Sequence, residues 1–362
     1  MPTTRPLFIV NPHSAGGSTG RRWEPEILPL VRARFPDARW VLTRAPRQAA
    51  ALAARARRES ADLVVAVGGD GTAHEVVNGL LGELLGRDGA TLPASLGATW
   101  NASGPNPGTS RAPGDIDEGA GDRPVLGILP IGTGCDLVKT LGIPRDLHRA
   151  LDILATGRTI PADVCEIDAV AADGRPLRRF SINMCGCGLS GDVAAQVNAA
   201  RWPRHGLLAF LIATLRGVAG YRPRSVTISV DGGPPRATRL LALFVCNGEY
   251  CGGGMRPGLG ARLDDGVLRV VEVGAMPLPK ILVKLRRLYS GHVEGVKGVL
   301  VHQARRVDVA PVDPVLVDCD GEQPGRLPAR YVVRPRSLRL VTGEHPAADR
   351  ESRDSRTTPP HP

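Results

Sequence analysis

A chain of 362 residues is long enough for two domains, and a hydrophobic content of 42% is enough for packed cores. The formal net charge of +10 favours an anionic partner such as a lipid, a phosphorylated small molecule or a nucleic acid. The sequence contains no zinc-finger spacing, no aromatic RNA-binding motif and no clustered basic arm, so we expect no nucleic-acid partner. The competing interpretation is that the charge only makes a solvated basic surface.

The cysteines and the apolar runs indicate the compartment. The seven cysteines are odd in number and include no Cys-x-x-Cys pair, which fits a reducing compartment. Met1 leads directly into the strand-like run 7–10 without a signal-peptide pattern, and the longest apolar run, 207–215, falls short of the about 20 residues that cross a bilayer. These features predict a cytoplasmic protein whose contact with the inner face of the membrane is peripheral.

The first half of the chain alternates between strand and helix patterns. Apolar runs predict strands at residues 7–10, 39–43, 62–67 and 125–131, and helices at 48–58 and 72–85. This βαβ alternation predicts an α/β fold whose N-terminal domain, residues 1–160, is a doubly wound parallel sheet. Residues 86–124 are crowded with Gly, Pro, Ser, Asn and Asp and predict a flexible insertion in a surface loop.

The second half has a different pattern. A helical region over 192–220 is followed by short β-rich runs at 226–230, 240–246, 267–273, 306–309 and 315–317, separated by Gly and Pro turns. These runs predict a largely antiparallel sandwich or barrel, and we assign residues 161–330 to a C-terminal β-sandwich domain. We expect the strand over 331–343 to return to the N-terminal domain and the polar tail 344–362 to be disordered.

The strongest single motif follows the predicted strand at 62–67. The sequence GGDGT at residues 68–72 leads into a helix, where glycines let the backbone approach phosphates and the helix N-terminus offers free N–H groups. Asp70 can orient a metal ion or a reacting hydroxyl, and Thr72 with Glu75 has capping-box spacing. The loop has neither the Walker nor the dinucleotide pattern, and an ordinary strand-to-helix turn is the alternative.

Two further loops resemble this one in composition. The sequence GTGCD at residues 132–136 follows the predicted strand at 125–131, and NPHSAGG at residues 11–17 follows the one at 7–10. Parallel strands present their carboxyl ends at one edge of a sheet, where ligands bind. The three loops together therefore predict a phosphate-binding site at this edge.

The loops resemble the catalytic domain of the diacylglycerol kinase family, which includes bacterial lipid kinases, sphingosine kinases and ceramide kinases. Three later motifs agree with this resemblance: NGEYCGGGM at 247–255, DDGVL at 264–268 and DGE at 320–322. The similarity extends over about residues 5–342 in the family's order. It implies a fold like those of diacylglycerol and NAD kinases, with the active site in the cleft between the two domains.

The same resemblance implies ATP and Mg²⁺ as cofactors. Glu322 would receive the proton of the acceptor hydroxyl, while Asp70 and Asp136 would manage the Mg²⁺ bound to the nucleotide. The residues expected against ATP are Asn11, Thr43, Gly68, Gly69, Asp70, Gly71, Thr72, Ala73, His74, Glu75, Gly132 and Thr133.

A structural Mg²⁺ is implied as well. It would bind the carboxylate of Asp265 and the backbone carbonyls of Arg262 and Val267. The expected partners are a diacylglycerol-like lipid and, through peripheral contact, a membrane; a homodimer is a further option. A basic amphipathic helix over residues 278–288 is a candidate for that contact, unless it packs on the β-rich domain with its charges in water.

Two positions depart from the family's usual pattern. The family commonly has Asn where this chain has Cys135, and often has Asn where it has His74, which is alternatively a helix residue without a ligand. The segment from His74 resembles sphingosine and ceramide kinases, whereas Thr133 and Asp136 resemble bacterial diacylglycerol kinases. We expect an ATP-dependent lipid kinase acting on diacylglycerol or a similar lipid. The alternatives are a sphingosine- or ceramide-type kinase, an NAD kinase, and a catalytically silent binding protein.

Overall fold

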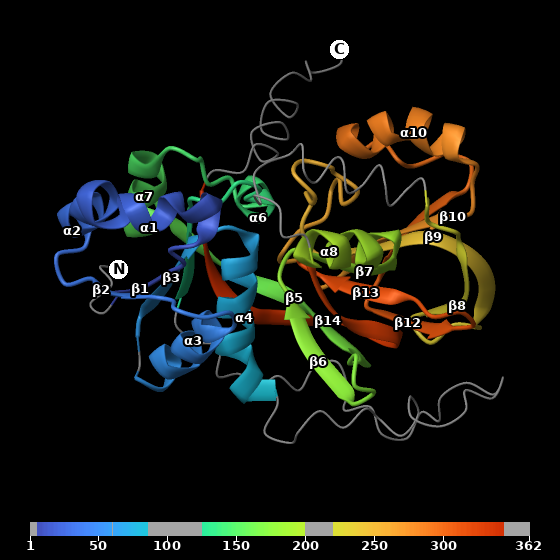
Figure 1. Cartoon of the computed structure of the whole chain (residues 1–362), viewed down its shortest axis with the longest axis horizontal. Helices are drawn as coiled ribbons and strands as arrows, with labels where there is room; N and C mark the ends of the chain where they lie inside the picture. The colour runs from blue at the N-terminus through green and yellow to red at the C-terminus, as the bar shows by residue number, and fades with distance from the viewer. Residues whose placement is uncertain (1–5, 60, 86–124, 200–219, 344–362) are drawn as a thin grey trace, which may run out of the picture.

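The computed structural model describes residues 6–59, 61–85, 125–199 and 220–343 of the chain. The expectations for the insertion at 86–124, the tail at 344–362 and most of the helical region at 192–220 lie outside these residues. Within them, the chain forms two halves that stand side by side. Figure 1 shows parallel strands with helices on the left and antiparallel strands on the right.

The first half is built on a parallel sheet with the strand order β2-β1-β3-β4-β14. Strands β1 (Pro6–Val10), β3 (Leu63–Gly68) and β4 (Val125–Pro130) are buried over nearly their whole length, whereas β2 (Arg39–Leu42) lies at the edge and is largely exposed. Buried parallel strands read as continuous apolar runs. This pattern explains why the predicted boundaries of β1, β3 and β4 are correct to within one residue at each end; those of the exposed β2 are correct to the same degree.

Helices cover this sheet on both sides. The helical segments are a 3₁₀ turn (Ser14–Gly17), α1 (Ser18–Arg22), a π turn (Trp23–Ile27), α2 (Leu28–Arg34), α3 (Gln48–Arg58), α4 (Asp70–Leu85), α6 (Asp136–Thr140) and α7 (Leu147–Thr156). In Figure 1, α2 and α7 lie on one side of the strands and α3 and α4 on the other. The last two pack closely because Gly79 has no side chain: a Cβ there would lie 2.1 Å from the carbonyl oxygen of Ala50.

The second half is a closed antiparallel barrel with strands added at its edges. Its strands are β5 (Arg158–Val170), β6 (Pro176–Ser181), β7 (Met184–Gly188), β8 (Arg224–Val230), β9 (Arg236–Cys246), β10 (Leu268–Gly274), β11 (Val299–Ala304), β12 (Arg306–Pro311), β13 (Leu316–Cys319) and β14 (Glu322–Thr342). Strands β14, β12, β8, β9, β7 and β13 pair in a closed cycle. β10 and β11 extend the sheet from β9, and β5 and β6 extend it from β14. The prediction of a sandwich or barrel thus takes the form of a barrel with sheet extensions.

Two long strands join the halves, so the chain does not divide cleanly at residue 160. β5 begins in the parallel half and runs antiparallel to β14 into the barrel. Within β14, Tyr331 lies in the barrel core, whereas Leu338 and Leu340 lie in the core of the parallel half. The strand expected to return over 331–343 therefore pairs with β4 only near its end, at Arg339 and Leu340.

Two helices lie over the barrel, α8 (Leu189–Ala199) and α10 (Leu278–Ser290) (Figure 1). α8 packs on β13, because Gly191 leaves room for the backbone of Leu316; a Cβ at Gly191 would lie 2.5 Å from the Leu316 carbonyl oxygen. Among the described helices, none is long and apolar enough to span a bilayer.

Candidate active site

The loops after β3 and β4 touch each other backbone to backbone. The amides of Ile131 and Gly132 both donate to the carbonyl oxygen of Gly68, at 3.0 Å each. A Cβ on Gly132 would lie 2.4 Å from the Cα of Gly69. Only glycine permits this approach, so the two predicted phosphate loops form one continuous glycine-lined surface.

The third loop is bound to the first. Asn11, which follows β1, donates from Nδ2 to Thr72 Oγ1 at 3.1 Å, and its backbone amide donates to Val67 O at 3.0 Å. Thr43, which follows β2, is buried and donates its amide to Val10 O at 2.8 Å. The structure therefore brings Asn11, Thr43 and Thr72 to one edge of the sheet, as the order of parallel strands predicts.

Helix α4 begins at Asp70, two residues earlier than predicted. The amides of Thr72 and Ala73 close the first turn on Gly69 O, at 3.0 and 3.2 Å, so Thr72 is not the N-cap. The expected capping box is absent, because Glu75 instead accepts the amides of Arg47 and Ala49, at 2.9 and 3.1 Å, at the start of α3. Glu75 thus holds α3 in place.

Asp70 connects the first loop to the second. Its carboxylate accepts the backbone amides of Asp136 and Leu137 at 3.0 and 3.1 Å, which satisfies the N-terminus of the short helix α6. Burial raises the pKa of Asp70, and the nearby Asp136 carboxylate adds to the effect. A cation would relieve this crowding of negative charge, so the two carboxylates fit a nucleotide-bound Mg²⁺.

Asp136 is buried and connects the site to the other half of the chain. It accepts Lys139 Nζ at 2.5 Å and the backbone amide of Gly253 at 2.7 Å. A Cβ on Gly254 would lie 3.6 Å from the same Lys139 Nζ, so the glycine-rich stretch at 247–255 closes over this lysine. Lys139 was missed from sequence, although its position three residues after Asp136 on a helix places the two side chains together.

Arg145 is a second cation that the sequence did not single out. Its Nη2 donates to the carbonyl oxygens of Gly132 and Thr133, at 2.5 and 3.3 Å. No lysine follows the glycines of the first loop. Among the described residues, Lys139 and Arg145 are the basic side chains that bond to the second loop and its helix. No local spacing rule connects Arg145 to the glycines, so only the folded chain reveals it.

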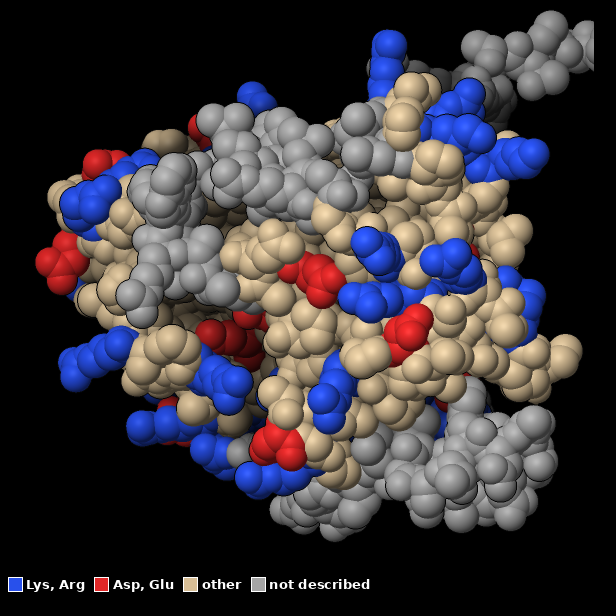
Figure 2. Space-filling view, turned by 45° about the vertical axis from the view of Figure 1, so that its right-hand side comes forward, with Lys and Arg blue, Asp and Glu red and all other residues tan. Residues whose placement is uncertain are grey.

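Glu322 reaches the phosphate loops from the barrel. It is the first residue of β14, and a Cβ on Gly71 would lie 3.6 Å from its Oε1. Its exposed carboxylate therefore lies against the N-terminus of α4, on the same helix turn as Asp70. Figure 2 shows a hollow in one face of the molecule with acidic side chains at its bottom. A carboxylate beside the N-terminus of α4 can accept a proton from a hydroxyl that attacks a bound phosphate.

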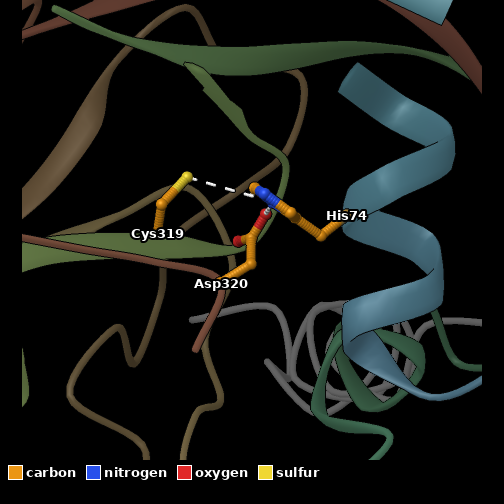
Figure 3. A group of neighbouring side chains, drawn as sticks. All are labelled: His74, Cys319 and Asp320. Carbon is orange, nitrogen blue, oxygen red and sulfur yellow. Dashed lines mark hydrogen bonds and ion pairs between the residues drawn. The ribbon is translucent and has the colours of Figure 1, made fainter. Parts of the chain in front are cut away.

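His74 does not face the glycine loops. It is buried, and its Nδ1 lies 3.0 Å from Asp320 Oδ2, with Cys319 Sγ at 3.9 Å (Figure 3). The ring of His74 turns toward the barrel, and the expectation that His74 lies against ATP stays a prediction. Ala73 is likewise buried in the core beside it.

The predicted structural metal site lies in the turn just before β10. Asp265 is exposed and accepts the amide of Val267 at 3.2 Å, while Arg262 Nε donates to Asp264 at 3.2 Å. Burial raises the pKa of Asp265, and the Asp264 charge adds to it; burial also raises the pKa of Asp163, with Asp264 and Asp265 contributing. Among the described residues, the oxygens of these three carboxylates do not all lie within 4.8 Å of one another, so they do not form a three-carboxylate site. The set of the Asp265 carboxylate with the carbonyls of Arg262 and Val267 stays a prediction.

Replacing Asp265 by Ala should abolish stabilisation by Mg²⁺. A site held at 100 times its Kd adds about 2.7 kcal/mol to folding stability, so the wild-type melting temperature should fall by several degrees in EDTA. The variant should melt at the same temperature with and without Mg²⁺. Calorimetry with Asp173→Ala, an exposed carboxylate in the β5–β6 turn, provides the control. A wild type that does not respond to EDTA would exclude this site.

A second acid, Asp318 on β13, makes stability depend on pH. It is buried, its Oδ2 has no hydrogen-bond partner, and the Ser190 hydroxyl lies beside it. Burial raises the pKa of Asp318 from 3.8 to about 7, with the Asp320 charge adding to it. The folded chain holds this proton more tightly than the unfolded chain, so the residue's contribution to stability falls between about pH 4 and 7.

Asp318→Asn should therefore stabilise the protein at pH 8 and change little at pH 4. The difference between the two pKa values corresponds to at most about 4 kcal/mol at pH 8. Urea unfolding at both pH values measures it. If the variant and the wild type lose stability in parallel between pH 4 and 8, the dependence comes from other groups.

Two family models match this chain. Residues 5–167 match the model of the diacylglycerol kinase catalytic domain, and residues 183–342 match the YegS C-terminal NAD kinase beta sandwich-like domain. The chain belongs to the diacylglycerol kinase catalytic-domain family. Family membership supports a kinase, that is, a phosphate-transferring enzyme, and a lipid kinase in particular.

Individual relatives agree over nearly the whole chain. A diacylglycerol kinase of Bacillus subtilis (strain 168) is 26% identical over 343 residues, covering 93% of this chain and 96% of the relative. One from Staphylococcus carnosus (strain TM300) is 24% identical and covers 93% and 95%. Two crystal structures from Bacillus anthracis str. Sterne share the fold, with TM-scores of 0.69 and 0.63, identities of 23% and 20%, and coverages of 96% and 95% of this chain and 99% and 98% of theirs.

Proposed function

We propose that this chain transfers the terminal phosphate of ATP to the hydroxyl of a diacylglycerol-type lipid, giving a phosphatidate-type product. The observation that carries the proposal is the position of Glu322. A carboxylate from the barrel lies against the first turn of α4, where the two glycine loops touch. Phosphoryl transfer needs mainly positioning, neutralisation of phosphate oxygens and a nearby proton acceptor.

Each group in the site takes one role in this proposal. The touching loops at Gly69 and Gly132 would let the triphosphate approach the backbone at the N-terminus of α4. Asp70 and Asp136 would hold the Mg²⁺ that arrives with ATP, and this ion would neutralise phosphate oxygens. Glu322 would accept the proton of the lipid hydroxyl.

The acceptor's tails would remain in the membrane while its hydroxyl enters the hollow. The outward face of α10 supports this geometry: Lys280, Arg286 and Arg287 are exposed, Val283 is 79% exposed, and the helix contains no acidic residue. Figure 2 shows Lys and Arg side chains gathered at the top of the barrel half, where α10 lies. A basic helix with an exposed apolar residue binds anionic lipid surfaces.

NAD kinase is the second candidate, because the C-terminal model that matches residues 183–342 is described as an NAD kinase beta sandwich-like domain. An acceptor experiment separates the candidates. Purified protein is incubated with labelled ATP and Mg²⁺, in mixed micelles of diacylglycerol, sphingosine or ceramide and, in parallel, with soluble NAD. Label in diacylglycerol supports the proposal, label in a sphingoid lipid or in NAD contradicts the assigned acceptor, and binding of ATP without transfer contradicts the enzyme.

A further inference from the structure

A buried hydrogen bond between His74 and Asp320 connects the two halves near the site. His74 lies on α4 and Asp320 in the turn between β13 and β14, 246 positions apart in sequence. The side chains are 9% and 2% exposed, and Figure 3 shows them pointing directly at each other. A buried, charge-assisted hydrogen bond of this kind is among the stronger ones in proteins.

Asp320 is held rigidly by its own half. Its Oδ1 accepts the Ser181 hydroxyl at 2.6 Å and the amides of Asn183 and Met184 at 3.1 and 3.0 Å. Its Oδ2 accepts the amide of Ile182 at 3.2 Å in addition to His74. Burial alone would raise the pKa of Asp320, but the bonds from His74, Ser181 and Met184 hold it below its ordinary value. The carboxylate is therefore ionised, and Nδ1 of His74 must be the donor.

The cluster of His74, Cys319 and Asp320 is not suited to bind a metal ion. His74, Cys319 and Asp320 lie close enough to share an ion. However, Asp320 already has three protein donors on Oδ1 and two on Oδ2, whereas each oxygen of Asp70 accepts one amide, so a metal at Asp320 would have to displace donors. Burial also raises the pKa of the Cys319 thiol well above its ordinary value, whereas a metal binds the thiolate. The ring of His74 therefore serves Asp320 and not an ion.

The hydrogen bond lies one helical turn from the site. Gly71, where an added Cβ would lie 3.6 Å from Glu322 Oε1, is three residues before His74 on α4, and Glu322 is two residues after Asp320. The distance between α4 and the β13–β14 turn at the His74 end therefore determines where the Glu322 carboxylate lies at the Gly71 end. Because the turn is short and the helix is rigid, the position of Glu322 relative to α4 cannot change independently of the His74–Asp320 bond.

We propose that His74 is a positioning residue that, through Asp320, holds the Glu322 carboxylate against the N-terminus of α4. This inference rests on the proposed function, since it concerns the placement of the proposed base. Displacing that carboxylate by about 1 Å would slow phosphate transfer by about 100-fold while leaving the ATP loops intact. The effect should therefore appear in kcat and leave the KM for ATP nearly unchanged.

Substitutions at His74 test the inference in the lipid-kinase assay. His74→Leu keeps bulk and removes the donor, so kcat should fall about 10- to 100-fold while the KM for ATP stays within about twofold. His74→Asn keeps a donor at the Nδ1 position and should restore kcat to within about threefold of wild type. His74→Gln moves the donor outward by one methylene and should have a kcat as low as that of His74→Leu. If His74→Leu does not fold, His74→Gln provides the test instead.

A buried hydrogen bond in the barrel core supplies the control. Tyr331 donates its hydroxyl to Gly186 O at 2.9 Å. Tyr331→Phe removes this bond and should lower the melting temperature without the kcat loss. Equal kcat losses at both positions, or normal kcat in the Leu and Gln variants of His74, would overturn the positioning role alone. A wild type that phosphorylates no lipid would overturn the proposed function, and this inference with it.

Discussion

Glu322→Gln should abolish nearly all lipid phosphorylation while leaving the protein folded. General-base catalysis by a positioned carboxylate contributes about 100- to 10,000-fold, and the amide that replaces it cannot accept a proton. The substitution preserves size and shape at an exposed position, so the melting temperature should remain within about one degree of wild type. Initial rates with saturating ATP and diacylglycerol micelles measure kcat.

A second substitution distinguishes position from charge. Glu322→Asp keeps the carboxylate but withdraws it by one methylene, which should lower kcat by about 100-fold at unchanged pH. Glu24→Gln, an exposed acid in the π turn Trp23–Ile27, controls for the loss of one negative charge. If Glu322→Gln keeps more than about a tenth of wild-type kcat, another group takes the proton and the assignment of the base is wrong.

The fold was predicted best where burial and sequence pattern coincide. Strands β1, β3 and β4 are apolar runs that end in glycine-containing loops, and α3 is a segment rich in Ala and Arg, so local pattern alone defines them. Of β14, only the part over 331–343 was predicted, because Pro324 and Pro328 interrupt the pattern before it. Its pattern was nevertheless present, since buried Ala329 and Tyr331 alternate with arginines.

The arginines of β14 made the segment look solvent-exposed in the sequence, although in the fold they form ion pairs with neighbouring strands. Arg330 pairs with Asp308 of β12 at 2.7 Å, and Arg334 pairs with Glu166 of β5 at 2.9 Å. Each polar residue thus has a partner on a neighbouring strand that a one-dimensional pattern does not connect. The long strand that joins both halves became visible only once its neighbours were known.

The site, like the fold, was predicted where local pattern determines it and not where contacts between distant elements do. The meeting of the three loops follows from the rule that parallel strands end at one edge, and sequence supplied it. The individual roles of Asp70, His74 and Glu75 did not follow, because each depends on a contact with another element. Asp70 binds α6, His74 binds the barrel and Glu75 binds α3. The motif from Gly68 to Glu75 therefore contains residues that build the site as well as residues that we propose face a ligand.

Gly132→Ala should separate the two phosphate loops and disable the kinase. The new Cβ would lie 2.4 Å from Gly69 Cα, 2.8 Å from Gly69 N and 3.3 Å from Gly68 C. All three opposing atoms are backbone, so no side-chain rotation relieves the clash and the loops must part. Overpacking of this kind destabilises by about 1–3 kcal/mol, and displaced phosphate contacts should lower kcat/KM for ATP by about 100-fold.

Gly82→Ala is the matched control for this prediction. It adds the same methyl group to α4, where nothing lies within 4 Å, and alanine stabilises a helix interior by up to about 1 kcal/mol relative to glycine. The control should therefore melt at or above the wild-type temperature with normal kcat/KM. If Gly132→Ala retains wild-type kcat/KM for ATP, the touching loops do not bind the nucleotide. The triphosphate would then have to bind away from Gly69, and Glu322 would no longer lie beside the reacting phosphate.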